Sequence, residues 1–359
     1  MFANDESELI EVLGSKDYRL VRKIGRGETA ECFLVFSNKY KSNFVCKRIK
    51  FNSGTVCRLC EVETLQKLNS HFVIAFYDYV LLANSIYIFL EFCPNGTMAE
   101  YIKNHGPLKD KQLLGVCKNI LESIQYIHEN HCAHLDLKPS NIFLDRYGRP
   151  KVADFGLARL FNRKDVKAHN DHSQKTNGTL MFMAPELFTP EIVCDPFIAD
   201  IWSLGIAFYF LAVGKSPWTG TTKAEVLSQI SDADFSWPFN FKNHEFVQLV
   251  NQMCELDPRD RPTAESLLSN PIFSKVDKKD GFLKIPKTKP GSKRRSLPRQ
   301  ERIVLLERTL TTSAPASLVA YTNQQSSASK AAAKSLFQSS VRMKRKAMAM
   351  PKSFQVKHY

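Results

Sequence analysis

The chain contains 359 residues, 43% of them hydrophobic, which is long enough for two packed lobes and a tail. Its formal net charge of +14 lies at one end, because residues 275–359 hold 20 Lys and Arg against 4 Asp and Glu. The remaining residues carry a balance of −2, so the sequence excludes a uniformly basic globule and places the basic character in a C-terminal tail.

The sequence pattern shows neither a membrane span nor a signal peptide. The longest apolar run, Ile206–Val213, is too short to cross a bilayer. The acidic start, Met1–Glu6, lacks the basic-then-apolar order of a secretory signal. Nine cysteines without regular spacing suit a reducing compartment, and Cys57 and Cys60 have no second pair at metal spacing. We therefore expect a cytoplasmic or nuclear protein.

The first elements in chain order predict an antiparallel sheet. After a short acidic lead-in at residues 1–17, Tyr18–Ile24 alternates apolar and polar side chains as a half-buried strand does. A second strand pattern ends at Phe36, and the segment 25–30 between the two reads Gly-Arg-Gly-Glu-Thr-Ala. Glycines at such a place let backbone N–H groups approach phosphate oxygens. For an isolated pair of glycines, a hairpin that merely requires glycine is the alternative.

The next elements continue a small β-rich region and then turn helical. Further strands are predicted at Phe44–Lys47, Phe72–Leu82 and Ile86–Leu90, with a helix at Thr55–Leu68. The Pro-Asn-Gly turn at residues 94–96 is typical of a hinge between lobes. A long amphipathic helix follows, with apolar residues at three- to four-residue spacing from Leu113 to Ile127.

The most informative stretch spans residues 134–156, which contain His-Leu-Asp-Leu-Lys-Pro-Ser-Asn and end with Asp-Phe-Gly. Phosphoryl transfer to a hydroxyl needs a carboxylate that accepts the proton, a cation that offsets phosphate charge, and oxygen ligands for Mg²⁺. Asp136, Lys138, and the pair Asn141 and Asp154 are the residue types for these three tasks. A lone aspartate in a loop is usually a cap or turn residue, and that alternative weakens when all four residues occur together.

This ordered set resembles the catalytic loop and metal motif of the eukaryotic protein kinases, with Lys-Pro-Ser-Asn typical of the serine/threonine type. The resemblance covers residues 18–273. It implies an α+β, bilobal kinase fold with a small β-rich N-lobe at 18–91 and a larger α-helical C-lobe at 94–273. A basic, largely disordered tail is expected at 274–359. The implied function is transfer of the ATP γ-phosphate to serine or threonine hydroxyls of protein substrates, with Mg²⁺.

The resemblance also implies a role for individual residues. Lys47 would contact the α- and β-phosphates and pair with Glu61, for which Glu63 is the rival. Asp136 would accept the hydroxyl proton, and Lys138 would stabilise the transferring phosphate. Thr179 would bond to Asp136 and Lys138, and Asn141 and Asp154 would bind Mg²⁺. Leu90 would be the gatekeeper beside the adenine. The residues implied to contact ATP are Ile24, Gly25, Arg26, Gly27, Ala30, Cys32 and the backbone groups of Glu91 and Cys93.

The sequence departs from the family pattern at several positions, among them Leu180 and Phe182, where proline and tyrosine are commoner. Ala30 replaces the third glycine of the phosphate loop and Cys32 replaces its usual valine, so we expect a stiffer loop and weaker nucleotide binding. Leu135 stands where most regulated kinases have the arginine that pairs with an activation-loop phosphate. We therefore expect that phosphorylation of this loop, where Ser173 and Thr176 are available, is not obligatory for activity.

The helical lobe carries two structural expectations. Glu186 should form a buried ion pair with Arg261, since pairing offsets the cost of burying both charges. Asp200, which opens an apolar helix running to Val213, should anchor the catalytic-loop backbone. Further helices are predicted at Ala224–Ile230, Glu245–Cys254 and Thr263–Leu268.

Substrate preference follows from the same resemblance. Thr97, Ser140 and Phe210 occupy the positions where arginine-directed kinases carry acidic residues, so we expect weak selection for basic residues before the acceptor. Phosphorylation of Ser296 in cis is then disfavoured, although it follows two arginines. Leu157 favours serine over threonine as the acceptor.

The basic tail and the catalytic domain leave alternatives open. The clusters 293–296 and 342–346 could serve as a nuclear-import signal or contact acidic partners, anionic lipid or nucleic acid; a solvated tail without a ligand is equally compatible. The alternative function is that of a pseudokinase, which is a scaffold with the same fold and no catalysis. Only Ala30 and Leu135 favour this alternative. A third possibility makes the tail the main functional element.

Overall fold

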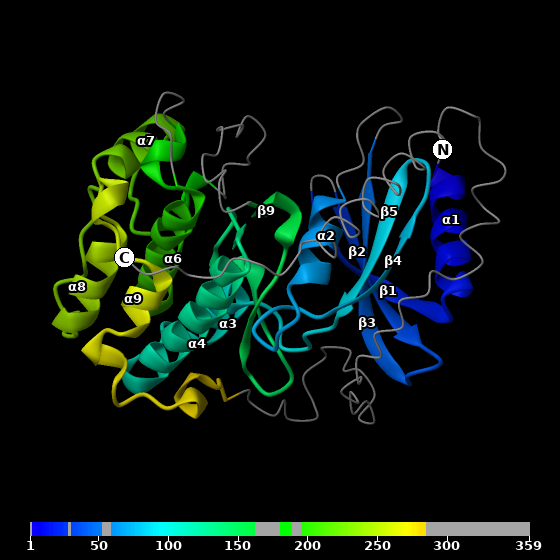
Figure 1. Cartoon of the computed structure of the whole chain (residues 1–359), viewed down its shortest axis with the longest axis horizontal. Coiled ribbons are helices and arrows are strands. Elements are labelled where there is room, and N and C mark those ends of the chain that lie inside the picture. The colour runs from blue at the N-terminus through cyan, green and yellow to red at the C-terminus, as the bar shows by residue number, and fades with distance from the viewer. Residues whose placement is uncertain (1, 28–29, 52–58, 162–179, 189–194, 285–359) are drawn as a thin grey trace, which may run out of the picture. The chain divides into compact units, whose positions relative to one another are not determined.

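The computed structural model describes residues 2–27, 30–51, 59–161, 180–188 and 195–284 (Figure 1). Its first part is a five-stranded sheet in the order β1-β2-β3-β5-β4, in which every neighbouring pair is antiparallel. The strands are β1 Tyr18–Arg26, β2 Ala30–Ser37, β3 Ser42–Lys50, β4 Phe76–Leu81 and β5 Ser85–Glu91. The predicted strands are therefore present, although β4 begins at Phe76 and not at Phe72.

One face of the sheet carries the helix α2, Cys60–Lys67. Val62 and Leu65 are buried on it, as the apolar spacing predicts. The earlier part of the predicted helix, from Thr55, lies outside the described residues, as does Cys57.

The N-terminal segment forms a helix, α1 Phe2–Ser15, and is not merely a lead-in to the sheet. Figure 1 shows α1 beside the sheet on the side away from the helical lobe. Leu9, Val12 and Leu13 are buried on the inner side of this helix. The Tyr87 hydroxyl of β5 donates a hydrogen bond to Glu8 Oε1 over 2.7 Å. The helix therefore covers apolar side chains that the sheet would otherwise expose to water.

Replacing Leu13 with alanine should lower the free energy of unfolding by about 2–5 kcal/mol, because the change leaves a cavity under α1. Urea denaturation of the full-length chain measures this effect. Ile10→Ala in the same helix is the matched control: Ile10 is 50% exposed, whereas Leu13 is 1% exposed. The control should change stability by less than about 0.5 kcal/mol. Equal losses in both variants would contradict the packing of α1 on the sheet.

The second part of the structure is mainly helical (Figure 1). Its α-helices are α3 Met98–His105, α4 Asp110–Glu129, α6 Pro196–Val213, α7 Lys223–Ser231, α8 His244–Met253 and α9 Ala264–Leu268. Its short strands are β6 Cys132–Ala133, β7 Ile142–Leu144, β8 Pro150–Val152 and β9 Arg159–Leu160. Its 3₁₀ turns are η1 Pro139–Asn141, η2 Phe155–Leu157, η3 Pro185–Phe188, η4 Pro258–Asp260, η5 Pro271–Phe273 and η6 Lys278–Gly281. The α+β architecture with a β-rich and a helical part is confirmed.

Helix α6 forms the centre of the helical part. Asp195 caps its N-terminus by accepting a hydrogen bond from the Phe197 N–H, and Gly214 ends it in the left-handed conformation at φ 85°. Within the described part of the chain, α6 is the one helix apolar and long enough to cross a membrane, but 78% of it is buried inside the protein. Its apolar character therefore reflects a core position.

The folded region extends beyond the predicted boundary at residue 273. Val276 and Leu283 are buried, and η6 lies between them. Residues 274–284 thus belong to the packed structure and not to a disordered tail. The boundary was placed too early because this segment is rich in lysine and has few apolar residues, a composition that favours disorder. The rest of the tail, residues 285–359, lies outside the described residues.

Candidate active site

The loop at residues 134–141 is fixed to helix α6 by Asp200. The Asp200 carboxylate accepts hydrogen bonds from the backbone N–H groups of His134 and Leu135, both over 2.7 Å. Its Oδ2 also lies 3.0 Å from His128 Nε2. Leu135 has a φ of 61°, a left-handed conformation that costs a non-glycine residue about 1–2 kcal/mol. The predicted anchoring role of Asp200 is confirmed, and its bonds hold the loop in this strained conformation.

Asp136 and its partners form one connected group. Lys138 Nζ lies 2.9 Å from Asp136 Oδ2 and 3.2 Å from Oδ1. Asn141 Nδ2 donates to the Asp136 carbonyl over 2.8 Å and to Asp136 Oδ2 over 2.9 Å. The sequence spacing alone could not show these contacts, which fold the loop back on itself and bring an ammonium, a carboxylate and an amide together.

The hairpin of β7 and β8 brings the Asp-Phe-Gly segment back to this loop. The Ala153 N–H donates to the Asn141 carbonyl over 2.9 Å. His134 Nδ1 accepts from the Asp136 N–H over 3.2 Å, so its Nε2 carries the proton and donates to the Ala153 carbonyl over 3.0 Å. The His134 ring also lies 4.9 Å from the ring of Phe155, which is fully buried. Asn141 and Asp154 are thereby held beside each other at the open end of one hairpin.

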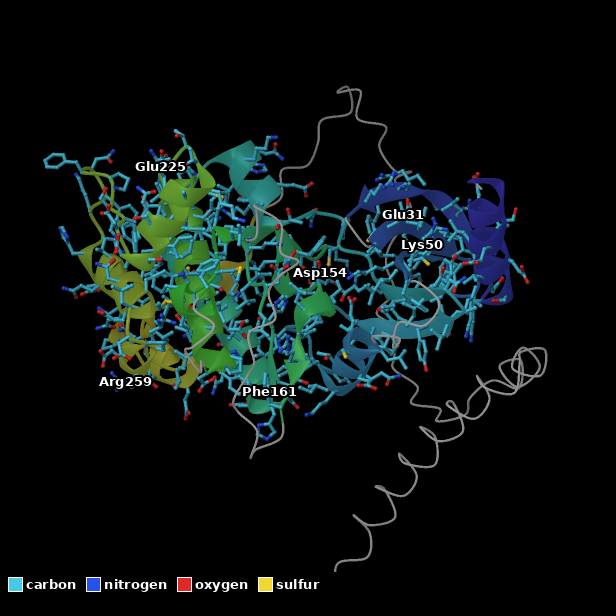
Figure 2. All side chains as sticks on the ribbon, turned by 90° about the horizontal axis from the view of Figure 1, so that it is seen from above. Glu31, Lys50, Asp154, Phe161, Glu225 and Arg259 are labelled. Atoms are coloured by element: carbon cyan, nitrogen blue, oxygen red, sulfur yellow. The ribbon has the colours of Figure 1, made fainter. Side chains whose placement is uncertain are left out.

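Lys47 joins the sheet to this hairpin. Its Nζ lies 2.7 Å and 3.0 Å from the two carboxylate oxygens of Glu61 in α2, and 2.7 Å from Asp154 Oδ1. Figure 2 shows Asp154 where the helical part meets the sheet. Glu61 is 4% exposed, whereas Glu63 is exposed on the opposite side of α2. The predicted choice of Glu61 over Glu63 is confirmed, because the helical period turns only one of them inward.

These contacts determine the charges of the site. Burial disfavours the Lys47 ammonium, but the carboxylates of Glu61 and Asp154 outweigh burial and raise the pKa of Lys47 above its usual range. The charge of Lys47 lowers the pKa of Asp154, against the opposing effect of burial. Lys47 therefore stays protonated and Asp154 stays ionised near neutral pH, as phosphate binding and metal binding require.

The glycine-containing turn joins β1 and β2, in which Gly25 pairs with Cys32. The Gly27 N–H donates to the Ala30 carbonyl over 2.7 Å, and residues 28–29 lie outside the described ranges. A Cβ at Gly25 would lie 3.7 Å from Cys32 Cβ, which is an ordinary contact. The chain itself does not require glycine at this position. Space for a bound group beside the backbone is a better reason for the residue.

Other predicted nucleotide contacts lie on the same strands. Ile24 and Arg26 are in β1, Ala30 begins β2, and Cys32 pairs with Lys47 across β2 and β3. Burial raises the pKa of the Cys32 thiol, so the thiol stays neutral near physiological pH.

The segment linking the sheet to the helical part carries an ion pair that the sequence pattern does not predict. The Glu91 carboxylate accepts from Lys151 Nζ over 2.8 Å and from the Ala75 N–H over 3.1 Å. No sequence signal distinguishes Lys151 from an ordinary strand lysine. The Cys93 N–H, predicted to contact adenine, donates to no residue within the described ranges. It is therefore available to a ligand.

Thr179, Ser173 and Thr176 lie outside the described residues, so their predicted roles stay predictions. The predicted ion pair between Glu186 and Arg261 is confirmed, with N–O distances of 2.6 Å and 2.8 Å between two buried side chains.

The donor atoms at Asn141 and Asp154 fit a magnesium ion. Asn141 uses its NH₂ group on Asp136, which leaves the amide oxygen as a ligand. Asp154 supplies a carboxylate whose Oδ1 already faces Lys47. Mg²⁺ in phosphoryl-transfer sites takes one or two carboxylates, substrate phosphates and water. No group of three or more His, Cys, Asp or Glu within the described residues forms a different metal site.

A bilobal α+β fold with a lysine–glutamate pair and an aspartate–lysine–asparagine loop defines a protein kinase. In agreement, residues 18–273 match the family described as the protein kinase domain, and the chain belongs to this family.

Curated relatives are similar to the chain at modest identity. Mitogen-activated protein kinase kinase 1 of Arabidopsis thaliana is 28% identical over 292 residues, which cover 78% of this chain and 80% of the plant protein. Calcium-dependent protein kinase 6 of Plasmodium berghei is 33% identical over 72% of this chain and 17% of its own length. Cell cycle serine/threonine-protein kinase CDC5/MSD2 of Saccharomyces cerevisiae is 29% identical over 70% of this chain and 36% of its own length. The chain thus spans less than two thirds of several relatives that it matches.

Proposed function

We propose that this chain is a Mg-ATP-dependent protein serine/threonine kinase. The observation that carries the proposal is the set of contacts that join Lys47 to Glu61 and Asp154, beside a loop in which Asp136, Lys138 and Asn141 are mutually bonded. Relatives named serine/threonine-protein kinases support the choice of acceptor.

Each residue of the site has a separate role in phosphate transfer. Lys47, kept charged by its two carboxylate partners, binds the α- and β-phosphates of ATP. The Asp136 carboxylate orients the substrate hydroxyl and accepts its proton, and the neighbouring Lys138 ammonium offsets charge on the transferring phosphate. Asn141 and Asp154 would hold Mg²⁺, which neutralises phosphate charge when it is bound. Thr179 is assigned to Asp136 and Lys138 by family resemblance alone.

Leu135 supports activity without phosphorylation of the activation loop. Its side chain is apolar and 7% exposed, so it offers no cation to a phosphate on Ser173 or Thr176. The loop conformation at Leu135 is instead held by Asp200, a residue of the protein core. The catalytic loop therefore has a permanent internal anchor.

The pseudokinase alternative would require loss of an essential group. Ala30 and Leu135 depart from the family pattern, but neither position supplies a proton acceptor, a phosphate-binding cation or a metal ligand in the family.

For the C-terminal tail, we propose that its basic clusters contact acidic partners or anionic surfaces, and that the protein is cytoplasmic or nuclear.

Phosphate transfer by the purified full-length chain tests the proposal. The protein is treated with phosphatase, repurified, and given Mg-ATP with a mixed serine and threonine peptide library. We expect transfer that persists after phosphatase treatment and is lost in Asp154→Asn. A folded wild-type protein that binds nucleotide but transfers nothing would support the scaffold. Transfer that depends on prior loop phosphorylation would contradict the role given to Leu135.

A further inference from the structure

The folded segment at residues 274–284, here called the strap, lies beyond the region that matches the kinase family, which ends at residue 273. It includes η6 and crosses helix α4 (Figure 1). Val276 and Leu283 of the strap are 6% and 2% exposed. The strap is therefore a folded segment beyond the family match that is held by a few buried residues, whereas most of its other side chains are exposed.

Polar side chains of α4 hold the backbone of the strap. Lys118 Nζ donates to the Val276 carbonyl over 2.9 Å and to the Phe273 carbonyl over 3.3 Å. Asn119 Nδ2 donates to the Lys278 carbonyl over 3.2 Å. These bonds attach the backbone of the strap and the residue before it to α4.

Two glycines allow the strap to approach α4 closely. A Cβ at Gly115, in the interior of α4, would lie 2.3 Å from the Gly281 nitrogen, and a Cβ at Gly281 would lie 2.3 Å from the Gly115 carbonyl oxygen. Glycine is unfavourable inside a helix. Its presence at Gly115 is explained by the backbone of the strap, which occupies the place of a side chain.

The strap ends on the turn between β7 and β8. The Leu283 N–H donates to the Gly148 carbonyl over 2.9 Å. Gly148 has a φ of 77°, and a Cβ on it would lie 2.0 Å from the Leu283 carbonyl oxygen. The same turn is hydrogen-bonded to the segment that links the sheet to the helical part, because Asn95 Nδ2 donates to the Asp145 carbonyl over 2.5 Å.

This hairpin carries the two proposed magnesium ligands. β7 begins directly after Asn141, and β8 ends two residues before Asp154. A shift of the turn would therefore move both ligands. The strap contacts neither of them, so any influence on the metal passes through the hairpin.

We propose that the strap is a positioning element that sets the geometry of Asn141 and Asp154 for a Mg²⁺-bound nucleotide. This inference rests on the proposed function and specifies a part of its site that the family match does not include. Groups that bond directly to metal ligands typically change metal affinity about 10–100-fold when they are altered. The strap acts one step further out, so we expect an effect near the lower limit of this range.

Two full-length variants loosen the strap by different routes. Leu283→Asp places a charge in a buried apolar contact, and Gly115→Ala places a methyl group against the Gly281 backbone. Gly14→Ala in α1 is the matched control, because a Cβ there meets nothing within 4 Å. Thermal unfolding identifies folded protein, and Leu283→Ala replaces the aspartate variant if that variant does not fold.

The measurement is calorimetric binding of a non-hydrolysable ATP analogue across a Mg²⁺ titration and in the presence of a chelator. We expect the Mg²⁺ concentration at half-saturation to rise about tenfold in both strap variants, with chelated binding and the control unchanged. The double variant Gly115→Ala/Leu283→Asp should match the stronger single variant, because both release the same contact.

The outcomes separate this inference from the proposed function. The strap variants could fold and melt at a lower temperature but bind the ATP analogue with the wild-type Mg²⁺ dependence. This result would overturn the positioning role and show that the strap only stabilises the fold. A wild-type chain that binds no nucleotide at any Mg²⁺ concentration would overturn the proposed function and the strap's role with it.

Discussion

Replacing Asp136 with asparagine should lower the rate of phosphate transfer by about 10²–10⁴-fold, the usual contribution of a positioned general base. The amide keeps the size of the side chain but cannot accept the hydroxyl proton. It also removes the negative charge that Lys138 Nζ contacts at 2.9 Å. Steady-state kinetics with a fixed peptide substrate measure the loss, which should fall on kcat and kcat/KM alike.

Nucleotide binding provides the control for this variant. Lys47 contacts Glu61 and Asp154 and not Asp136, and the amide oxygen of the variant side chain can still accept from Asn141 Nδ2. The affinity of Asp136→Asn for Mg-ATP should therefore stay within about threefold of wild type. A variant that retains full transfer would exclude Asp136 as the base. A variant that loses both nucleotide binding and transfer would indicate a disrupted fold.

Replacing Arg261 with methionine should destabilise the protein by about 3–5 kcal/mol, because the buried Glu186 carboxylate would lose the guanidinium that neutralises it. Arg261 and Glu186 are 4% and 3% exposed and share two hydrogen bonds. The guanidinium also donates to the Glu255 carbonyl over 2.6 Å and lies 4.9 Å from the ring of Trp202. Urea denaturation measures the free energy of unfolding.

Two further variants test the cause of this loss. Arg259→Met is the matched control, since the Arg259 side chain is 88% exposed and pairs with Asp257 at the surface, and it should not change stability measurably. Figure 2 shows Arg259 at the edge of the helical part. Adding Glu186→Gln to Arg261→Met should restore part of the lost stability. No restoration would indicate that lost packing, and not the loss of the neutralising guanidinium, is responsible.

The local motifs identified most of the candidate site without the structure. Asp136, Lys138 and Asn141 lie within six consecutive residues, and a short loop with a fixed spacing leaves few possible arrangements. Glu61 could be chosen over Glu63 because its register to Leu65 and Leu68, Glu-x-x-x-Leu-x-x-Leu, matches the kinase family. The strands and helices could be predicted because apolar side chains repeat with the period of each element.

Contacts between residues far apart in the chain could not be derived from those patterns. The sequence at residues 1–17 shows acidic residues, but the packing of Leu13 under the sheet depends on strands that come later. Lys151 reads as an ordinary strand lysine until its bond to Glu91 is seen. Gly115 reads as a weak point of a helix until the strap is found against it.

The sequence by itself indicated the family, most of the strands and helices, and the candidate residues for phosphate transfer, because each depends on residue type and short-range spacing. The tertiary structure decided that α1 and residues 274–284 are packed against the kinase domain, and which side chains join its parts. α1 and the strap are stable only against surfaces built by other segments, so their own composition does not reveal them. The apolar area that is buried between distant segments depends on the folded chain as a whole, so a local sequence pattern cannot predict it.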